Sequence, residues 1–336
     1  MNAACSSRVF WYLWCAYSCT DPHTGALTIM AITDTVKLGI NGSIQRVRMC
    51  AERTGLPPLL IVQAGPGLPL LHEVRKFQRL LQLEKDFLVS YWEQRGCGNA
   101  SKQDAKSVSL VQQVDDLRAI LRWLHNETKQ TVSVLGISLG ATIALQAVEN
   151  EPNKVKSVIA ISPDASTTES DASVNSFLQD RSALARDGRL SGRVKKLGRP
   201  PYTNPAAFQG RASLLADLGA IEHGKNFNAI LRETLFGMIR TYGLFGTAKA
   251  LRNMNLIQSK LLPELVSLDL FPRPPRLAVP VHYVFGEQDA LTPSALANRL
   301  PEAIEAPART AILVPNAGHM VHFDQPEIVR SIVVSA

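Results

Sequence analysis

The stretch Gly136-Ile137-Ser138-Leu139-Gly140 combines residue types and a spacing that could present a nucleophile. An apolar run, 132–135, precedes it, and a stretch with helical character, 141–150, follows it. A serine at a sharp turn between a strand and a helix holds its hydroxyl above the edge of a sheet. Glycines suit the flanking positions because a side chain there would collide with the neighbouring strand or helix. The pattern therefore predicts that Ser138 is a nucleophile.

A serine hydroxyl is a weak nucleophile near neutral pH, so it needs a base, and the base needs an acid that orients it. Asp289 follows the apolar run 281–285, and His319 follows the apolar run 310–313. Side chains that follow the carboxyl ends of parallel strands meet at one edge of a sheet. We therefore predict a catalytic triad of Ser138, Asp289 and His319, a chain order typical of this kind of serine turn.

Other residues could take the two partner roles. The acid could be Asp164, which also follows an apolar run, or Glu287, two residues before Asp289. Asp289 is preferred because the loop after strand 281–285 is the usual place for the acid. The alternatives for the base are His322, three residues after His319, and two histidines for which a structural role is expected, His125 and His282.

The developing negative charge on a substrate oxygen needs backbone N–H donors. Leu139, directly after the serine, can supply one of them. The second donor is predicted in Gln63-Ala64-Gly65-Pro66-Gly67, from the amide of Ala64 or Gly65. Glycines allow the backbone to approach a substrate closely, and proline stiffens the loop.

Apolar runs alternate with segments of helical periodicity before residue 164 and again after residue 275, and these elements would position the residues named above. The predicted strands are 44–49, 59–62, 87–92, 132–135, 155–161, 281–285 and 310–313. Predicted helices run over 111–124, which Ser107 or Ser109 would cap, over 141–150, and from about Pro293 and from Pro326. This alternation is typical of an α/β protein with a mostly parallel, doubly wound sheet.

The alternation stops between about 164 and 275. This stretch has no clear buried strand, and its helix-like segments 230–239 and 256–268 are separated by polar and Gly/Pro-rich loops. We predict an α/β core formed by 30–163 and 276–336, with 164–275 as a helical cap over the site.

The composition is ordinary for a globular protein, with 46% hydrophobic and 19% charged residues. Part of the net charge of +7 lies within Arg181 to Arg211, including Arg193, Lys195, Lys196 and Arg199. No aromatic residues interleave with those four charges, so they indicate a solvated face and no nucleic-acid partner. The five cysteines form no C-x-x-C pair, and no Cys/His cluster has metal-ligand spacing. We therefore expect a reducing compartment, no metal and no cofactor.

The N-terminal region needs separate treatment. Residues 9–17 form an apolar, aromatic-rich run that is too short to span a bilayer. The basic region before it consists of Arg8 alone, and no clean small-x-small cleavage site follows it. We predict that 1–29 is an extension outside the fold, with Met30 as an alternative start. A cytoplasmic location is expected, while the apolar run leaves secretion open.

Several of these motifs together resemble the α/β-hydrolase superfamily, in the branch that contains proline iminopeptidases, over about 35–336. The loop 63–67 resembles that branch's His-Gly-Gly-Pro-Gly, and 91–101 is similar to its Asp-Gln-Arg-Gly-x-Gly-x-Ser segment. The sequence departs from this pattern at Gln63-Ala64, at Leu68-Pro69, at Glu93, and at Ile137 and Leu139 beside the serine.

The resemblance implies a cofactor-independent serine hydrolase that acts on a small ester, amide or short peptide through an acyl-enzyme. The apolar residues Leu68 and Ile137, with Gln63, are candidates for the substrate pocket. We expect carboxylic ester hydrolysis first and an aminopeptidase of the proline iminopeptidase type second. A free amino terminus would need carboxylates, which Glu222, Glu233 and Glu264 could supply. The alternative of another class is a non-catalytic ligand receptor with this fold.

Overall fold

The computed structural model describes residues 31–185 and 188–336. The predicted extension 1–29 and the alternative start at Met30 lie outside these residues. In the described part, no helix is both long enough and apolar enough to cross a bilayer.

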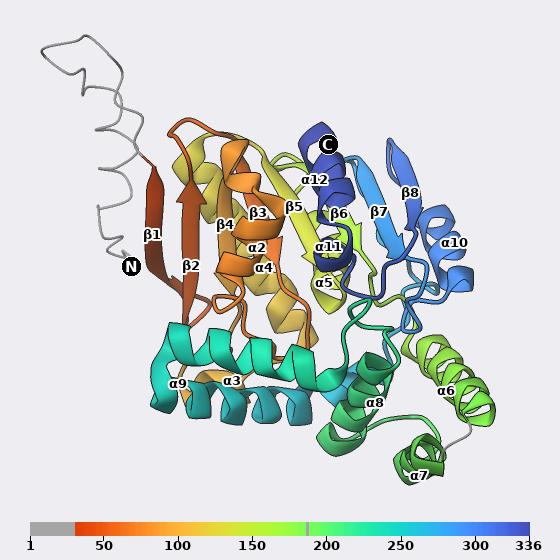
Figure 1. Cartoon of the computed structure of the whole chain (residues 1–336). Helices are drawn as coiled ribbons and strands as arrows, with labels where there is room; N and C mark the ends of the chain where they lie inside the picture. Colours follow the sequence, from red (N-terminus) through yellow and green to blue (C-terminus); the bar gives the residue numbers. More distant parts are fainter. Residues whose placement is uncertain (1–30, 186–187) are drawn as a thin grey trace, which may run out of the picture.

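One mixed sheet of eight strands forms the centre of the molecule (Figure 1). The spatial order is β1-β2-β4-β3-β5-β6-β7-β8, and every pair from β4 to β8 is parallel. This arrangement confirms the predicted α/β fold with a mostly parallel sheet. The strands are β1 (Ile32–Ile40), β2 (Ser43–Ala51), β3 (Pro58–Val62), β4 (Leu88–Glu93), β5 (Val132–Ile137), β6 (Val155–Ile161), β7 (Val281–Gly286) and β8 (Arg309–Val314).

The strand β1 was not predicted from the sequence. It pairs antiparallel with β2 along its whole length, from Ile32 opposite Ala51 to Ile40 opposite Ser43. The turn Asn41-Gly42 joins them with positive φ at both residues, which is the preferred chemistry of a two-residue hairpin. Most side chains of β1 are exposed because it is an edge strand, so it lacks the apolar run of the buried strands.

Helices cover both faces of the sheet. On one face α4, α5 and α10 enclose a core with Leu117, Leu145 and Leu300 at its centre. On the other face α2, α11 and α12 enclose a second core around Phe77 and Val329. The elements are α2 (Val74–Leu81), the 3₁₀ turn η1 (Leu83–Lys85), α3 (Lys102–Lys106), α4 (Leu110–Thr128), α5 (Leu139–Val148), α10 (Ser294–Ala303), α11 (Val321–Asp324) and α12 (Pro326–Ser335).

The helix α4 shows how the sequence fixes a boundary. Ser109 caps it, because its side chain accepts a hydrogen bond from the Gln112 amide at 3.1 Å. Of the two predicted caps, the structure therefore selects Ser109. Leu117 and Ile120 are buried as their spacing predicts, whereas Val111, in the first turn, is 72% exposed.

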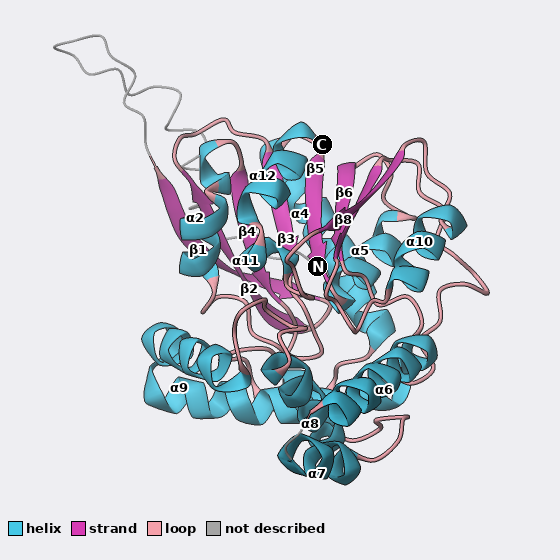
Figure 2. Cartoon of the chain, turned by 45° about the vertical axis from the view of Figure 1, so that its right-hand side comes forward, coloured by secondary structure: helices cyan, strands magenta, loops and turns pink. Residues whose placement is uncertain are grey.

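Four helices lie between β6 and β7: α6 (Thr167–Leu184), α7 (Gly188–Leu197), α8 (Pro205–Asp217) and α9 (Phe227–Leu265). We call them the helical insertion. They gather along the sheet edge at which the parallel strands end (Figures 1 and 2). The predicted helical segments 230–239 and 256–268 both fall largely within α9, which bends at Gly243 (φ 70°, ψ 176°) into a first arm, 227–242, and a second arm, 244–265. The division into core and cap stays a prediction.

Candidate active site

Ser138 occupies a strained turn between β5 and α5. Its φ of 54° and ψ of −126° lie in a region that costs non-glycine residues about 1–3 kcal/mol. A Cβ at Gly136 would lie 2.5 Å from Ala141 Cα, and one at Gly140 would lie 2.2 Å from the Gln63 carbonyl oxygen. The glycines therefore allow the close approach that the turn requires. The Ser138 amide donates to the Ile161 carbonyl at 2.8 Å, which holds the turn against the end of β6.

Asp289 and His319 form a buried hydrogen-bonded pair. The Nδ1 of His319 lies 2.8 Å from the Oδ2 of Asp289, while Oδ1 of Asp289 accepts from the amides of Leu291 and Thr292 at 2.8 and 3.0 Å. With the proton on Nδ1, Nε2 is left as the acceptor that a nucleophilic serine needs. The described contacts contain no hydrogen bond between Ser138 and the His319 ring. The structure thus brings together the predicted acid and base, and places the serine at the same sheet edge.

The pKa values of the pair are moved apart. Burial alone would lower the pKa of His319, but the charge of Asp289 and their hydrogen bond outweigh it, so this pKa is raised above its ordinary value of 6.5. Burial would raise the pKa of Asp289, but the charge and hydrogen bond of His319 and the Thr292 amide lower it. Asp289 is therefore held ionised beside an imidazole that readily takes a proton.

These directions predict how activity depends on pH. The imidazolium form of His319 cannot accept the serine proton, so kcat/KM should fall as the pH decreases through a midpoint above 6.5. A pH–rate profile on a non-ionising ester measures this midpoint, and a midpoint well below 6.5 would contradict the assigned base. The contribution of His319 to folding stability changes with pH in the opposite direction to the activity. A raised histidine pKa contributes stability that is present at low pH and is lost as the pH rises through the folded-state pKa.

The alternative partners have other surroundings. Glu287 is exposed, and His322 is buried in the second core, stacked on Phe77, with its pKa lowered by burial. The remaining two histidines make ordinary contacts, His125 with the Gln130 carbonyl at 2.8 Å and His282 with Thr310 Oγ1 at 2.9 Å.

Asp164 differs from these alternatives because it lies within the site. It follows β6, which stands between β5 and β7 in the sheet, and its carbonyl accepts from Thr142 Oγ1 in the first turn of α5 at 2.8 Å. Burial raises the pKa of Asp164, and the charge of His319 opposes that effect. Asp164 is thus close enough to His319 for their charges to interact, yet Asp289 holds the hydrogen bond.

The loop 63–67 lies directly against the serine turn. A Cβ on Gly65 would lie 2.9 Å from Leu139 Cδ2, so the amides of Leu139 and of Ala64 or Gly65 belong to neighbouring backbone segments. The Nε2 of Gln63 donates to Cys97 Sγ at 3.5 Å. The role of the amides of Leu139 and of Ala64 or Gly65 as oxyanion donors stays a prediction.

The predicted pocket residues lie in different places. Gln63 is buried beside Cys97, and Leu68 is half-buried in the segment after the loop. Ile137 packs into the second core with Leu70 and Phe77. A contact between any of the three predicted residues and a substrate stays a prediction.

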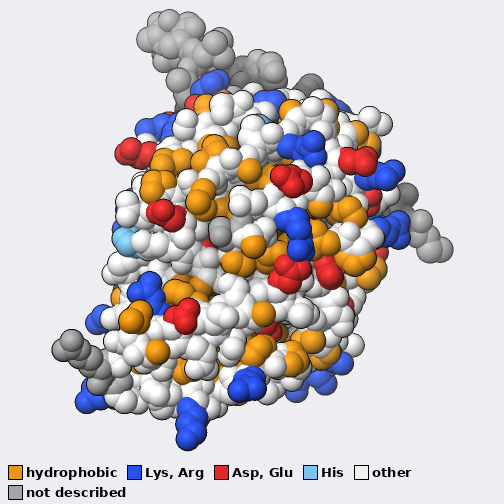
Figure 3. Space-filling model, turned by 90° about the vertical axis from the view of Figure 1, so that its right-hand side faces the viewer, with side chains coloured by type: hydrophobic (Ala, Val, Ile, Leu, Met, Phe, Trp, Pro, Cys, Tyr) orange, Lys and Arg blue, Asp and Glu red, His pale blue; other side chains and the backbone are white. Residues whose placement is uncertain are grey.

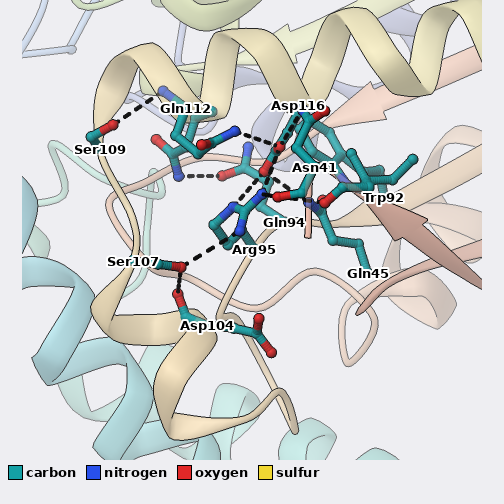
Figure 4. Close-up of polar contacts among 12 residues, drawn as sticks. Asn41, Gln45, Trp92, Gln94, Arg95, Asp104, Ser107, Ser109, Gln112 and Asp116 are labelled. Atoms are coloured by element: carbon teal, nitrogen blue, oxygen red, sulfur yellow. Dashed lines mark hydrogen bonds and ion pairs between the residues drawn. The ribbon is translucent and has the colours of Figure 1, made fainter. Parts of the chain in front are cut away.

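A buried ion pair supports the loop that carries Cys97. Arg95 donates to both carboxylate oxygens of Asp116, from Nε at 2.7 Å and from Nη2 at 2.9 Å (Figure 4). The same carboxylate accepts from the side chains of Asn41, Gln45 and Gln112. The network joins the β1–β2 hairpin, the end of β4 and α4, so it fixes the start of the segment that carries Cys97, the partner of Gln63.

Replacing Asp116 by alanine should therefore lower the free energy of unfolding by about 3–5 kcal/mol, because it leaves the Arg95 charge buried without a partner. Urea denaturation measures the loss. The neighbouring Asp115 is a matched control, since its side chain is 48% exposed and pairs with Arg118 on the surface. Asp115→Ala should cost less than about 1 kcal/mol. Equal losses in the two variants would contradict the role given to the buried pair.

The helical insertion contacts the histidine loop through its backbone. The amides of His319 and Met320 donate to the carbonyls of Ala220 and Ile221, each at 2.9 Å. Ser138, Asp289 and His319 are all buried.

Sequence reasoning missed the polar pairs that the insertion brings to the site. Arg211 of α8 forms a buried ion pair with Asp171 of α6, and its charge acts on the pKa of His319. Tyr242 of α9 donates to the buried carboxyl group of Glu93 at the end of β4. These partners are 40 and 149 residues apart, and no local pattern in the sequence marks them.

The three glutamates proposed for a substrate amino terminus already have partners. Glu222 lies 3.0 Å from Lys76 Nζ and 2.8 Å from Lys225 Nζ, and the same lysines pair with Glu233. Glu264 accepts from the Leu110 amide at 2.8 Å. In residues 31–185 and 188–336, no group of three or more His, Cys, Asp or Glu side chains is arranged to hold a metal ion.

Comparison with known proteins gives a consistent result. The model of the alpha/beta hydrolase fold family matches residues 57–326. A probable aminopeptidase, YbaC, of Bacillus subtilis is 24% identical over 297 residues, which cover 87% of this chain and 92% of that protein.

Solved structures show the same fold. The proline iminopeptidase of Mycobacterium smegmatis superposes with a TM-score of 0.62 at 17% identity, over 90% of this chain and 97% of its own. An esterase from Exiguobacterium antarcticum superposes with a TM-score of 0.56 at 18% identity, over 90% and 98% of the two chains.

Proposed function

The chain belongs to the alpha/beta hydrolase fold family and is a hydrolase, and we propose that it cleaves a carboxylic ester or amide through a serine-bound acyl intermediate. Ser138 is the nucleophile, His319 the general base and acid, and Asp289 the group that orients the imidazole. The observation that carries the proposal is the buried His319–Asp289 hydrogen bond of 2.8 Å at the sheet edge that also bears the strained turn of Ser138.

The reaction follows from these positions. Ser138 Oγ forms a bond to the carbonyl carbon while its proton passes to Nε2 of His319. The amides of Leu139 and of Ala64 or Gly65 hydrogen-bond the oxygen that becomes negative. The carbonyl re-forms, the bond to the leaving group breaks, and His319 gives the proton to that group. Water then adds to the acyl-enzyme with His319 as base, which releases the acid and restores the serine. The missing Ser138–His319 hydrogen bond is compatible with these reaction steps, since such contacts often tighten only when substrate is bound.

Ester hydrolysis is our first choice because the charges around the insertion do not favour a free amino terminus. Glu222 and Glu233 are neutralised by two lysines, and Glu264 is engaged with a backbone amide. The helical insertion would act as the cap, with Leu68 and the neighbouring apolar residues bounding the acyl or alcohol group.

A fluorophosphonate probe tests the proposed nucleophile. We expect the folded protein to be labelled at Ser138, found by peptide mass mapping, and heat-denatured protein to remain unlabelled. No labelling of the folded protein would favour the other class of function, a non-catalytic ligand receptor with the same fold.

The second candidate is an aminopeptidase of the proline iminopeptidase type. It is favoured by two similar proteins, the probable aminopeptidase YbaC and the proline iminopeptidase of Mycobacterium smegmatis. A panel of p-nitrophenyl esters beside aminoacyl-nitroanilides, proline included, separates the two candidates. We expect the esters to have the higher kcat/KM, and a preference for prolyl-nitroanilide would reverse the order.

A further inference from the structure

The helix α9 exposes five large apolar side chains, which is unusual for a helix at a protein surface. Phe245 is 95% exposed, Leu244 71%, Phe236 69%, Ile239 42% and Leu231 37%. We call these five residues the apolar ridge. Surface helices normally turn their apolar side chains towards the core. A contiguous apolar patch on the outside usually marks an interaction surface.

The helix α9 also has a side that packs against the rest of the protein. Met238 is buried on the inward side of the first arm, and a Cβ on Gly237 would lie 3.1 Å from the His72 carbonyl oxygen. Tyr242 reaches inward to Glu93. The inward face of the helix is therefore occupied, and the ridge is an additional apolar face.

The backbone places the most exposed residues at a tip. Gly243 breaks the helix, and Leu244 and Phe245 follow it directly, where the two arms meet. In Figures 1 and 2 this end of α9 lies at the side of the helical insertion away from α6 and α7. The ridge thus runs along the first arm of α9 and ends at the bend where the second arm begins.

The two charged residues that share a helix face with Phe236 are both basic. Arg232 and Arg240 are exposed and spaced four residues on either side of Phe236, so they lie on the same helix face. In the described residues neither arginine pairs with a carboxylate. Glu233, the only acid of the first arm, is paired with Lys225. By contrast, the face in Figure 3 intermixes cationic and anionic side chains.

We propose that the apolar ridge docks on an anionic lipid surface. Aromatic and aliphatic side chains insert between lipid headgroups, while neighbouring arginines bind the anionic groups. A second copy of the chain fits less well. A two-fold contact would place Arg232 and Arg240 of the two copies against each other. The ridge has five residues, whereas a standard protein interface has roughly 20–30 residues on each side. The inference does not depend on the proposed reaction.

Vesicle co-sedimentation tests the proposal. The full chain is mixed with vesicles of phosphatidylcholine alone or of an equal mixture of phosphatidylcholine and phosphatidylglycerol. We expect binding to the mixed vesicles, weakened by added salt. Phe236→Ser with Phe245→Ser should reduce the partition coefficient by at least about tenfold, from the loss of apolar burial. Arg232→Gln and Arg240→Gln should each reduce it by about fivefold.

Val111→Ser is the matched control, because Val111 is 72% exposed but lies on α4, outside the ridge. It should bind like the unchanged chain. Turnover of a water-soluble ester should stay the same in all of these variants, which separates docking from catalysis. Failure of the unchanged chain to bind the mixed vesicles would overturn the proposal. The proposal would also be overturned if light scattering detected a dimer that Phe245→Ser dissociates and the unchanged chain did not bind the vesicles.

Discussion

Replacement of Ser138 by alanine is expected to lower kcat by about 10³-fold or more on any substrate that the protein turns over. The hydroxyl supplies the atom that bonds to the carbonyl carbon, and the neighbouring backbone offers no substitute for it. Steady-state kinetics on the best ester of the panel measures the loss, and circular dichroism shows whether the variant is folded.

Ser133→Ala is a suitable comparison, because Ser133 is buried on β5, five residues before Ser138. Its kcat should match that of the unchanged chain. If Ser138→Ala kept its turnover, the nucleophile would lie elsewhere and the assignment of the site would be wrong.

Asp289→Asn should lower kcat by about 10⁴-fold, the loss typical when the acid of such a triad becomes an amide. The amide keeps the size of the side chain, but it no longer stabilises the imidazolium or fixes the proton on Nδ1 of His319. Folding should persist, because the amides of Leu291 and Thr292 can still donate to the side-chain oxygen.

Asp164→Asn provides the discriminating comparison. The charge of Asp164 acts on His319, but Asp289 holds the hydrogen bond, so Asp164→Asn should change kcat by less than about tenfold, far below the loss expected for Asp289→Asn. It should also lower the pKa of His319, which moves the acid limb of the pH–rate profile to lower pH. The reverse ranking of the two variants would make Asp164 the acid of the site.

The fold could be predicted from the sequence where strands are buried on both faces. Leu59 to Val62 and Val134 to Leu135 are completely buried, and such strands are continuous apolar runs. The strand β1 was missed because only one of its edges is paired and its exposed residues include Thr33, Asp34 and Thr35. The helix α2 was missed because it has only eight residues, with polar residues between Val74, Phe77 and Leu81.

The position of the site could be predicted because its chemistry is encoded locally. The glycines around Ser138 and the loops after β7 and β8 lie next to their strands in the chain, so the strand order alone brings Asp289 and His319 to one edge. Contacts made by the helical insertion depend instead on how α6, α8 and α9 pack, and the pairs Asp171–Arg211 and Glu93–Tyr242 arise only from that packing.

The two backbone hydrogen bonds that join Ala220 and Ile221 to His319 and Met320 constrain how a substrate reaches the buried serine. Lifting this part of the insertion would break both bonds and release the backbone that carries the His319 imidazole beside Asp289. If His319 is the base, as we propose, we expect residues 220 and 221 to stay in place while substrate enters. We expect the route of entry to open at another border of the insertion.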